Sequence, residues 1–235
     1  MTRLSYQVDP DNPTAPPIGL IVLQVDETLE PEIKAYFQDT PNPTYVTRIP
    51  SAPEVTVANL KGMETDLAAA ATLLPTSRQY GAIGYGCTSA SSVIGSKKVE
   101  ALIKSCCDTQ HVTDPLRATI ANAQHMGVSR FALLSPYVEE VNTPLRASFA
   151  AHGITTDVFG SFEQPNEATV ARISMSSIVD AASQLGSDPS VDSVFLSCTN
   201  LRTLDAIPLI QDRIGKPVLS SNQSLAWHLK HLVSV

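Results

Sequence analysis

Short apolar runs alternate with amphipathic helical segments along almost the whole chain, and this alternation restricts the available folds more than any other feature. "IGLIVLQ" (18–24) is apolar and rich in β-branched residues, which is typical of a strand buried on both faces. The amphipathic "ETLEPEIKAYFQ" (27–38) follows it, and the same order recurs as far as "NQSLAWHLKHL" (222–232). Strands that alternate with helices form βαβ units, so we predict an α/β fold with a mostly parallel sheet between helices.

The elements that this pattern predicts cover the chain from residue 18 onward. Expected strands are 18–24, 44–49, 80–86, 130–135, 155–160, 193–198 and 216–221. Expected helices include two long ones, 56–74 and 166–186, and others over 27–38, 114–127, 142–153 and 222–232. A further helix is expected directly after the strand 80–86.

The chain also repeats itself at an offset of 111 residues. "CTS" (87–89) falls on "CTN" (198–200), and "LIVLQVDE" (20–27) falls on the run from residue 131, so that Asp26 is matched to Tyr137. Any two βαβ units share helix patterning, but cysteine is scarce here, with 4 in 235 residues. We therefore infer a duplicated α/β half, with one cysteine at the carboxyl end of a strand in each copy.

This repeat divides the chain into three parts. They are an N-terminal arm (1–17), a first α/β domain (18–110 plus 212–235) and a second α/β domain (111–211). Prolines at four positions of the arm exclude a helix or a central strand there. We expect the arm to lie on the surface or on a partner, which leaves room for a homo-oligomer.

Composition excludes several classes of protein. Hydrophobic residues make up 43% and charged residues 17%, as in a compact globular protein. The net charge is −7 and the densest basic run is "SKK" (96–98), so no nucleic-acid partner is expected. The sequence contains neither a bilayer-spanning stretch nor a signal peptide, which predicts a cytoplasmic protein without a membrane partner. Without a CxxC pair, its cysteines are expected to be free thiols.

The two equivalent cysteines lie where α/β proteins build their sites. Ligands bind beyond the carboxyl ends of parallel strands, so facing halves would bring Cys87 and Cys198 to opposite sides of one cleft. Each is also expected to precede a helix start, where free N–H groups and the helix dipole lower the pKa of a thiol. The polar residues beside them could cap these helices or bind a substrate carboxylate. They are Thr88, Ser89, Thr199 and Asn200.

Two thiols on opposite sides of a small substrate suit two reactions. One thiolate can remove a proton from the carbon beside a carboxylate while the opposing thiol delivers a proton to the other face, which inverts the stereocentre. Alternatively, a thiolate adds to an activated double bond, the adduct rotates, and elimination releases the isomer. Neither reaction requires a metal or an organic cofactor.

Five stretches of the chain together resemble a known superfamily. They are "IGLIVLQVDETLE", "GYGCTSAS", "LLSPYVEEVN", "LSCTNLRTLD" and "GKPVLSSNQSLAWH", and they lie in order over nearly the whole chain. The chain resembles the aspartate/glutamate racemase superfamily, in the branch of maleate cis-trans isomerases, arylmalonate decarboxylases and ectoine-utilisation racemase-like proteins. The resemblance implies two pseudo-symmetric flavodoxin-like halves, with the active site in the cleft between them.

The resemblance also implies a metal- and PLP-independent isomerase with no cofactor. On the matching positions, Cys87 and Cys198 would be the catalytic pair. Tyr137 would donate its hydroxyl to the substrate carboxylate or to an enolate-like intermediate. The four polar neighbours of the cysteines would bind the carboxylate. Decarboxylases of this branch lack the first-half cysteine, so its presence here argues against decarboxylation.

One departure from the family bears on the substrate. Maleate isomerases resemble "PSSNTT" after the first strand, whereas this chain has "LQVDET", which places Asp26 and Gln24 near the substrate. A carboxylate at this point would repel a dicarboxylate and attract an α-ammonium group. We therefore expect an amino-acid substrate, as in glutamate racemases, which carry an Asp after strand one. The alternative is that Asp26 caps the following helix.

Two further residues are candidates for substrate binding. Arg48 follows a short strand and could neutralise a second carboxylate, although a surface ion pair is the alternative. Asn166 precedes a helix of the second half and could face the substrate or serve as an ordinary N-cap.

The sequence supports three hypotheses for the function of this protein. The first is a two-cysteine racemase of a small carboxylate, with an amino acid as the expected substrate. The second is a maleate cis-trans isomerase that works by addition and elimination. The third is a small-molecule binding protein that keeps the cleft without turnover.

Overall fold

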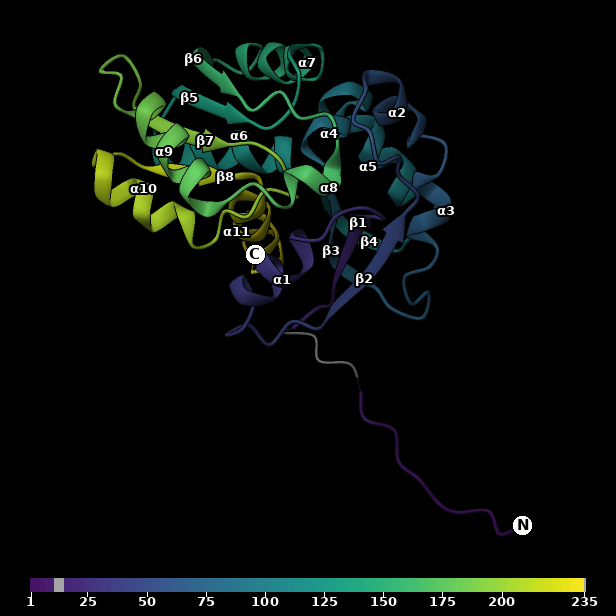
Figure 1. Ribbon diagram of the computed structural model, residues 1–235. Coiled ribbons are helices and arrows are strands. Elements are labelled where there is room, and N and C mark those ends of the chain that lie inside the picture. Colours follow the sequence, from purple (N-terminus) through teal and green to yellow (C-terminus); the bar gives the residue numbers. More distant parts are fainter. Residues whose placement is uncertain (11–14, 235) are drawn as a thin grey trace.

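The computed structural model, which describes residues 1–10 and 15–234, contains two four-stranded parallel sheets side by side (Figure 1). The first sheet consists of β1 (Ile18–Leu23), β2 (Thr44–Ile49), β3 (Tyr80–Gly86) and β4 (Thr109–Thr113), in the order β2-β1-β3-β4. The second consists of β5 (Arg130–Ser135), β6 (Thr155–Ser161), β7 (Ser193–Leu196) and β8 (Val218–Ser220), in the order β6-β5-β7-β8. The α/β fold with two similar halves is thus confirmed.

Helices cover both faces of each sheet. In the first part of the chain they are α1 (Leu29–Tyr36), α2 (Val57–Gly62), α3 (Leu67–Ala71), α4 (Thr88–Ile94) and α5 (Ser96–Lys104). The second part contains α6 (Pro115–Met126), α7 (Glu139–Ala150), α8 (Glu167–Val170), α9 (Met175–Gly186), α10 (Ala206–Ile214) and α11 (Ser221–Val233).

The strand side chains alternate between two apolar layers in each half. In the first sheet Leu20 and Val22 pack against α1 and α11, while Ile21 faces α3 and α5. In the second sheet Phe131 and Leu133 pack against α6 and α7, and the opposite face contacts α9 and α10. One of these clusters is continuous across both halves and contains the two equivalent cysteines. Burial of these central strands on both faces explains their uninterrupted apolar runs.

The two halves exchange one helix each. The first sheet ends at β4, and the next helix, α6, packs on the second sheet. The second sheet ends at β8, and the next helix, α11, packs back on the first sheet. Strand pairing places β4 in the first sheet and β8 in the second, and the division of the chain at 110/111 and 211/212 stays a prediction. The polar β4 was not anticipated, and only its pairing with β3 identifies it as a strand.

Both long helices that the sequence predicts are interrupted. Residues 56–74 form α2 and α3 with a turn between them, and residues 166–186 form α8 and α9. The second break has a local cause, because the Ser174 hydroxyl accepts a hydrogen bond from Ser177 N and caps a new helix. The offset of 111 residues also carries β2 onto β6, β3 onto β7 and α5 onto α10, but it carries α4 onto residues 199–205, which form no helix.

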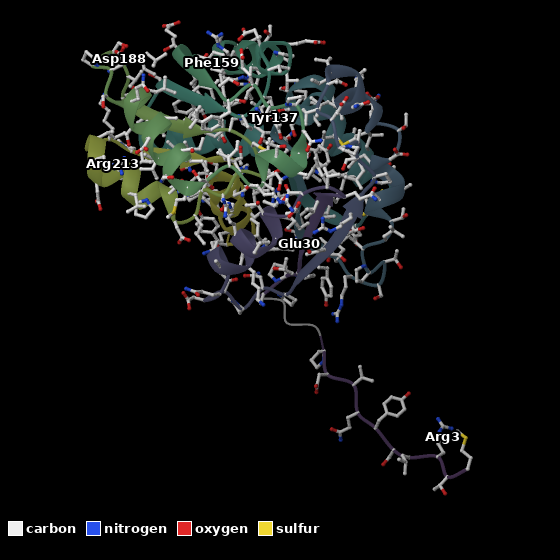
Figure 2. All side chains as sticks on the ribbon, in the orientation of Figure 1. Arg3, Glu30, Tyr137, Phe159, Asp188 and Arg213 are labelled. Carbon is white, nitrogen blue, oxygen red and sulfur yellow. The ribbon has the colours of Figure 1, made fainter. Side chains whose placement is uncertain are left out.

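Residues 1–10 of the expected arm are exposed, contain no helix or strand, and extend away from the body of the molecule (Figure 1), where Figure 2 labels Arg3. Residues 11–14 of the arm lie outside the described part of the chain. Ala15 is already buried. Association through the arm stays a prediction. No helix within the described residues is long and apolar enough to cross a bilayer.

Gly86 provides a test of the packing beneath the site. A Cβ at Gly86 would overlap Leu29 Cδ2 of α1 and lie 3.2 Å from Ile21 O. Gly86→Ala is therefore expected to lower the free energy of unfolding by about 1–3 kcal/mol, measured by urea denaturation. Gly62→Ala is the matched control, since nothing lies within 4 Å of its Cβ, and it should stabilise α2 slightly. Equal effects of the two substitutions would contradict this packing.

Candidate active site

Cys87 lies between β3 and α4 and is 6% exposed. Its backbone is extended and its Sγ accepts a hydrogen bond from Ala90 N at 3.4 Å, so the thiol is the N-cap of α4. The strand–helix junction expected from the sequence is therefore present here. The sulfur lies against backbone N–H groups at the carboxyl edge of the first sheet.

Cys198 occupies the equivalent position in the second half but differs in conformation. It is 2% exposed and has a φ of 108°, a left-handed value that costs a residue other than glycine about 1–3 kcal/mol. Its N–H donates to Ser221 Oγ at 3.0 Å, which helps to hold this conformation. No helix begins until Ala206, so the prediction that a helix starts after Cys198 is wrong.

Both thiols have raised pKa values, which corrects the expectation of lowered ones. Burial raises the pKa of Cys87 to about 12, with smaller contributions from the carboxyls of Glu167 and Asp26. Burial and the same two carboxyls raise the pKa of Cys198 well above its usual range. Desolvation therefore outweighs the N–H groups of the helix start. In the resting protein both cysteines are neutral thiols.

Tyr137 connects Cys198 to a buried acid. Its hydroxyl lies 2.8 Å from Cys198 Sγ and donates to Glu167 Oε1 at 2.7 Å, and the residue, labelled in Figure 2, is buried. Asn200 holds the other carboxylate oxygen, since its Nδ2 donates to Glu167 Oε2 at 2.8 Å. Burial raises the pKa of Glu167, and the nearby Asp26 adds to that shift.

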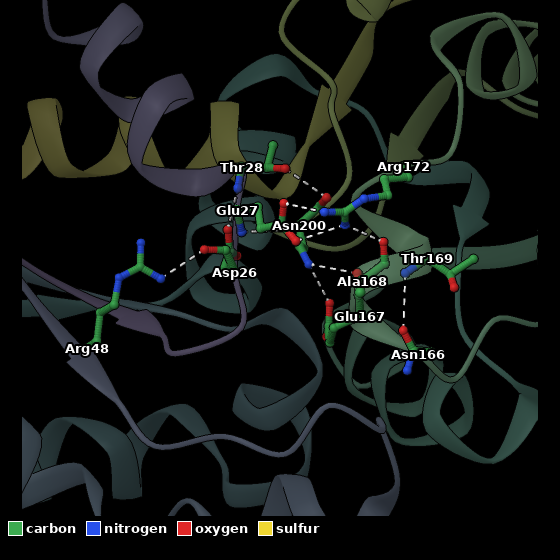
Figure 3. Close-up of polar contacts among 10 residues, drawn as sticks. All are labelled: Asp26, Glu27, Thr28, Arg48, Asn166, Glu167, Ala168, Thr169, Arg172 and Asn200. Atoms are coloured by element: carbon green, nitrogen blue, oxygen red, sulfur yellow. Dashed lines mark hydrogen bonds and ion pairs between the residues drawn. The ribbon is translucent and has the colours of Figure 1, made fainter.

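Asn200 also joins the two halves. Its Oδ1 accepts from Glu27 N at 2.8 Å and its backbone O accepts from Thr28 Oγ1 at 2.9 Å, so it lies between the β1–α1 loop and α8 (Figure 3). Its side chain is thereby engaged by protein groups. These bonds fix the position of Asn200 beside Glu167, and its expected contact with substrate stays a prediction.

Asp26 caps α1 with one oxygen and leaves the other unpartnered. Its Oδ1 accepts from Thr28 N and Leu29 N, both at 2.8 Å, whereas Oδ2 is buried without a hydrogen bond. Burial raises the pKa of Asp26 despite these two N–H donors, the Thr199 hydroxyl and the nearby Arg48, which all lower it. The capping alternative is therefore confirmed for one oxygen. The other is a buried polar atom of a carboxyl that raises the pKa of both thiols.

Gln24 and Arg48, two further candidates for substrate binding, lie near the end of the first sheet's central strand β1. The Gln24 side chain is exposed at the end of β1, outside the buried cluster. Arg48 Nη1 donates to the carbonyl oxygen of Asp26 at 2.9 Å (Figure 3) and to that of Leu23 at 2.9 Å. Its Nη2 forms an ion pair with Glu30, as the alternative reading of Arg48 expected, and these contacts hold the β1–α1 loop. Its role toward a substrate stays a prediction.

The remaining polar candidates support the backbone around the thiols. Thr88 Oγ1 donates to Ser221 Oγ at 2.7 Å, the same hydroxyl that accepts from Cys198 N, so one serine connects both cysteine segments. Thr199 Oγ1 donates to Gly86 O at 3.3 Å, and Ser89 is buried at the start of α4. Asn166 Oδ1 accepts from Thr169 N, so Asn166 is the N-cap of α8 (Figure 3).

Two buried acids carry no functional signal in the sequence. Glu167 follows Asn166 in the first turn of α8, where an acidic residue is ordinary and therefore gives no functional signal. Glu32 of α1 accepts from Thr203 N at 2.6 Å and from Asn222 Nδ2 at 2.8 Å. It ties the loop after Cys198 to the first half. No group of three metal-ligating side chains occurs among residues 1–10 and 15–234.

Comparison with known proteins identifies the family. The family model described as "Arylmalonate decarboxylase" matches residues 55–235. The chain belongs to the arylmalonate decarboxylase family. This confirms the branch of the aspartate/glutamate racemase superfamily that the motifs indicated.

Within this family the chain is similar to enzymes with two different names. It is 32% identical over 111 residues to an arylmalonate decarboxylase of Bordetella bronchiseptica, in an alignment that covers 47% of this chain and 46% of that protein. It is 27% identical to a maleate isomerase of Geobacillus stearothermophilus over 90% of this chain and 89% of that protein.

Solved structures share the fold. A Nocardia farcinica maleate cis-trans isomerase variant with a covalently bound succinylcysteine intermediate superimposes with a TM-score of 0.85, at 22% identity and over 94% of each chain. An unliganded arylmalonate decarboxylase gives 0.76 at 23% identity, over 93% of each chain.

Asp26→Asn is expected to stabilise the protein increasingly as the pH rises. Since burial raises the pKa of Asp26 above its ordinary 3.8, the folded state binds more protons than the unfolded state between these two pKa values, and stability falls with pH there. Asn keeps an acceptor for Thr28 N and Leu29 N but does not ionise. The gain is at most about 1.4 kcal/mol per pH unit, measured by denaturation at several pH values. A difference independent of pH would contradict the raised pKa.

Proposed function

We propose that this protein is a cysteine-dependent isomerase of a small carboxylate, with Cys87 and Cys198 acting from opposite halves. The observation that carries this proposal is the pair of buried thiols at equivalent strand ends, both within the electrostatic reach of Asp26 and Glu167. Packing alone would not require a polar cluster around them, because unpaired buried polar groups cost free energy.

The first candidate reaction is cis–trans isomerisation of a maleate-type substrate. It is supported by the Geobacillus maleate isomerase, which aligns over nearly the whole chain. The succinylcysteine of the Nocardia enzyme is the adduct that a thiolate forms with maleate, so addition and elimination suit this fold. A neutral Asp26 could then donate a hydrogen bond to a substrate carboxylate, and its raised pKa favours that form.

The second candidate is racemisation of an amino acid, the reaction first expected from the sequence. Its support is the buried, unpartnered Oδ2 of Asp26, which would attract an α-ammonium group if ionised. Glu167 places a second carboxyl in the same cluster. If ionised, the carboxylates of Asp26 and Glu167 would both repel a dicarboxylate substrate.

Two other readings have less support. Decarboxylation is disfavoured because both cysteines are present, whereas decarboxylases of this branch lack the first-half thiol. A binding protein without turnover is disfavoured because the named relatives are enzymes. Free thiols at all four cysteines suit the cytoplasm.

Cys87→Ser and Cys198→Ser are each expected to lower kcat by about a hundredfold or more, because a hydroxyl is a poor replacement for a reacting thiol. The measurement is turnover of maleate and of D- and L-amino acids, followed by double-bond absorbance and optical rotation. Cys106→Ser is the matched control. This thiol follows α5, donates to Ala68 O and is not one of the two equivalent cysteines. Normal turnover by either site variant would refute the proposal.

Asp26→Asn separates the two candidate reactions. With a maleate-type substrate the neutral amide should keep or raise kcat/KM and remove its decline at high pH. With an ammonium substrate the same change should lower kcat/KM by about tenfold or more. Turnover in deuterated water provides a second criterion, because racemisation must place deuterium at the α-carbon whereas addition and elimination need not.

A further inference from the structure

We propose that Glu167 stores the proton that leaves Cys198, and that Tyr137 carries the proton between them. This inference rests on the proposed function only in taking Cys198 as a reacting thiol. It assigns a positioning role in proton transfer to Glu167, which acts through Tyr137 and does not need to touch the substrate.

The three groups form an unbroken chain of contacts. Cys198 Sγ lies 2.8 Å from the Tyr137 hydroxyl, and this hydroxyl lies 2.7 Å from Glu167 Oε1. Asn200 Nδ2 donates to the other oxygen, Oε2, at 2.8 Å. Oε1 is therefore the oxygen that can take up a proton, and the contact with Asn200 survives the transfer.

The transfer balances without a further reactant. The S–H bond of Cys198 breaks as its proton moves to the Tyr137 oxygen, while the original phenolic proton moves to Glu167 Oε1. The products are a Cys198 thiolate, an intact Tyr137 hydroxyl and a neutral Glu167 carboxylic acid. The reverse movement restores the thiol after the substrate has reacted.

Burial makes this route favourable compared with loss of the proton to water. Ionising Cys198 beside an ionised Glu167 would place two negative charges in a desolvated cluster that also contains Asp26 and Cys87. Moving the proton to Glu167 creates no additional charge, because one negative charge only changes its place. The guanidinium of the nearby Arg172 does not supply a compensating charge, since it forms an ion pair with Glu27 at the surface (Figure 3).

The arrangement distinguishes the two cysteines. The polar contact of Cys87 Sγ is Ala90 N, a backbone donor that cannot accept a proton. Cys198 alone of the pair contacts a hydroxyl that leads to a carboxylate. Cys198 is therefore the thiol of the pair that can ionise by passing its proton to a group within the protein.

The test is the pH dependence of Cys198 alkylation by iodoacetamide without substrate, followed by mass spectrometry of the Cys198 peptide. In the native chain the rate should level off once Glu167 ionises, since the thiolate fraction then depends on an internal transfer. In Glu167→Gln, which keeps the shape but cannot store the proton, the rate should rise about tenfold per pH unit.

Several controls separate proton storage from structural support. A merely structural loss would change access to Cys198 and shift the rate equally at all pH values, leaving the slope unchanged. Glu139→Gln, an exposed acid on α7, makes the same change of charge and should keep the native profile. Alkylation of the half-buried Cys106 serves as an internal reference in every variant.

Glu167→Met provides a second variant if Glu167→Gln does not fold. It keeps a side chain of similar length, removes the ionisable carboxyl that holds the proton, and should also abolish the plateau. An unchanged plateau in either folded variant would overturn the proton store. A plateau that depends on Glu167 in a chain that isomerises no substrate would refute the proposed function and leave the proton store standing.

Discussion

Asn200 fastens the two halves together beside both thiols. Its side chain donates to Glu167 of the second half and accepts from Glu27 N of the first. Its backbone oxygen accepts from Thr28, so the β1–α1 loop is held directly over the segment that follows Cys198. These bonds join the two halves next to the cysteines, which are both buried. The electrostatics of the site follow from this desolvation.

The desolvated cluster contains more acidic groups than it can ionise together. Asp26 and Glu167 each have a raised pKa, and each raises the pKa of both cysteines. A thiolate formed by loss of a proton to water would therefore be costly. The contact of Tyr137 with both Cys198 and Glu167 allows a thiolate to form without adding charge. The halves are related by the repeat, but only the second has this contact, so the site is chemically asymmetric.

Several features of the site followed from the sequence because they are local. The cysteine positions, the end of β3 and the capping role of Asp26 each depend on residues within a few positions. Prediction was wrong where distant residues decide the outcome. The segment after Cys198 is held by Ser221 and by Glu32, and no helix begins there before Ala206.

The sequence by itself determined the α/β class, the duplication and the equivalent positions of Cys87 and Cys198 in the two halves. Hydrophobic periodicity and a repeated motif are written in the order of residues, and they survive any packing that buries the same faces. Only the tertiary structure decided that Glu167 lies beside Tyr137 and that both thiols are neutral at rest. The Glu27–Asn200 hydrogen bond joins residues 173 positions apart, and no local pattern encodes such a contact. The direction of each pKa shift depends on the burial that those long-range contacts produce.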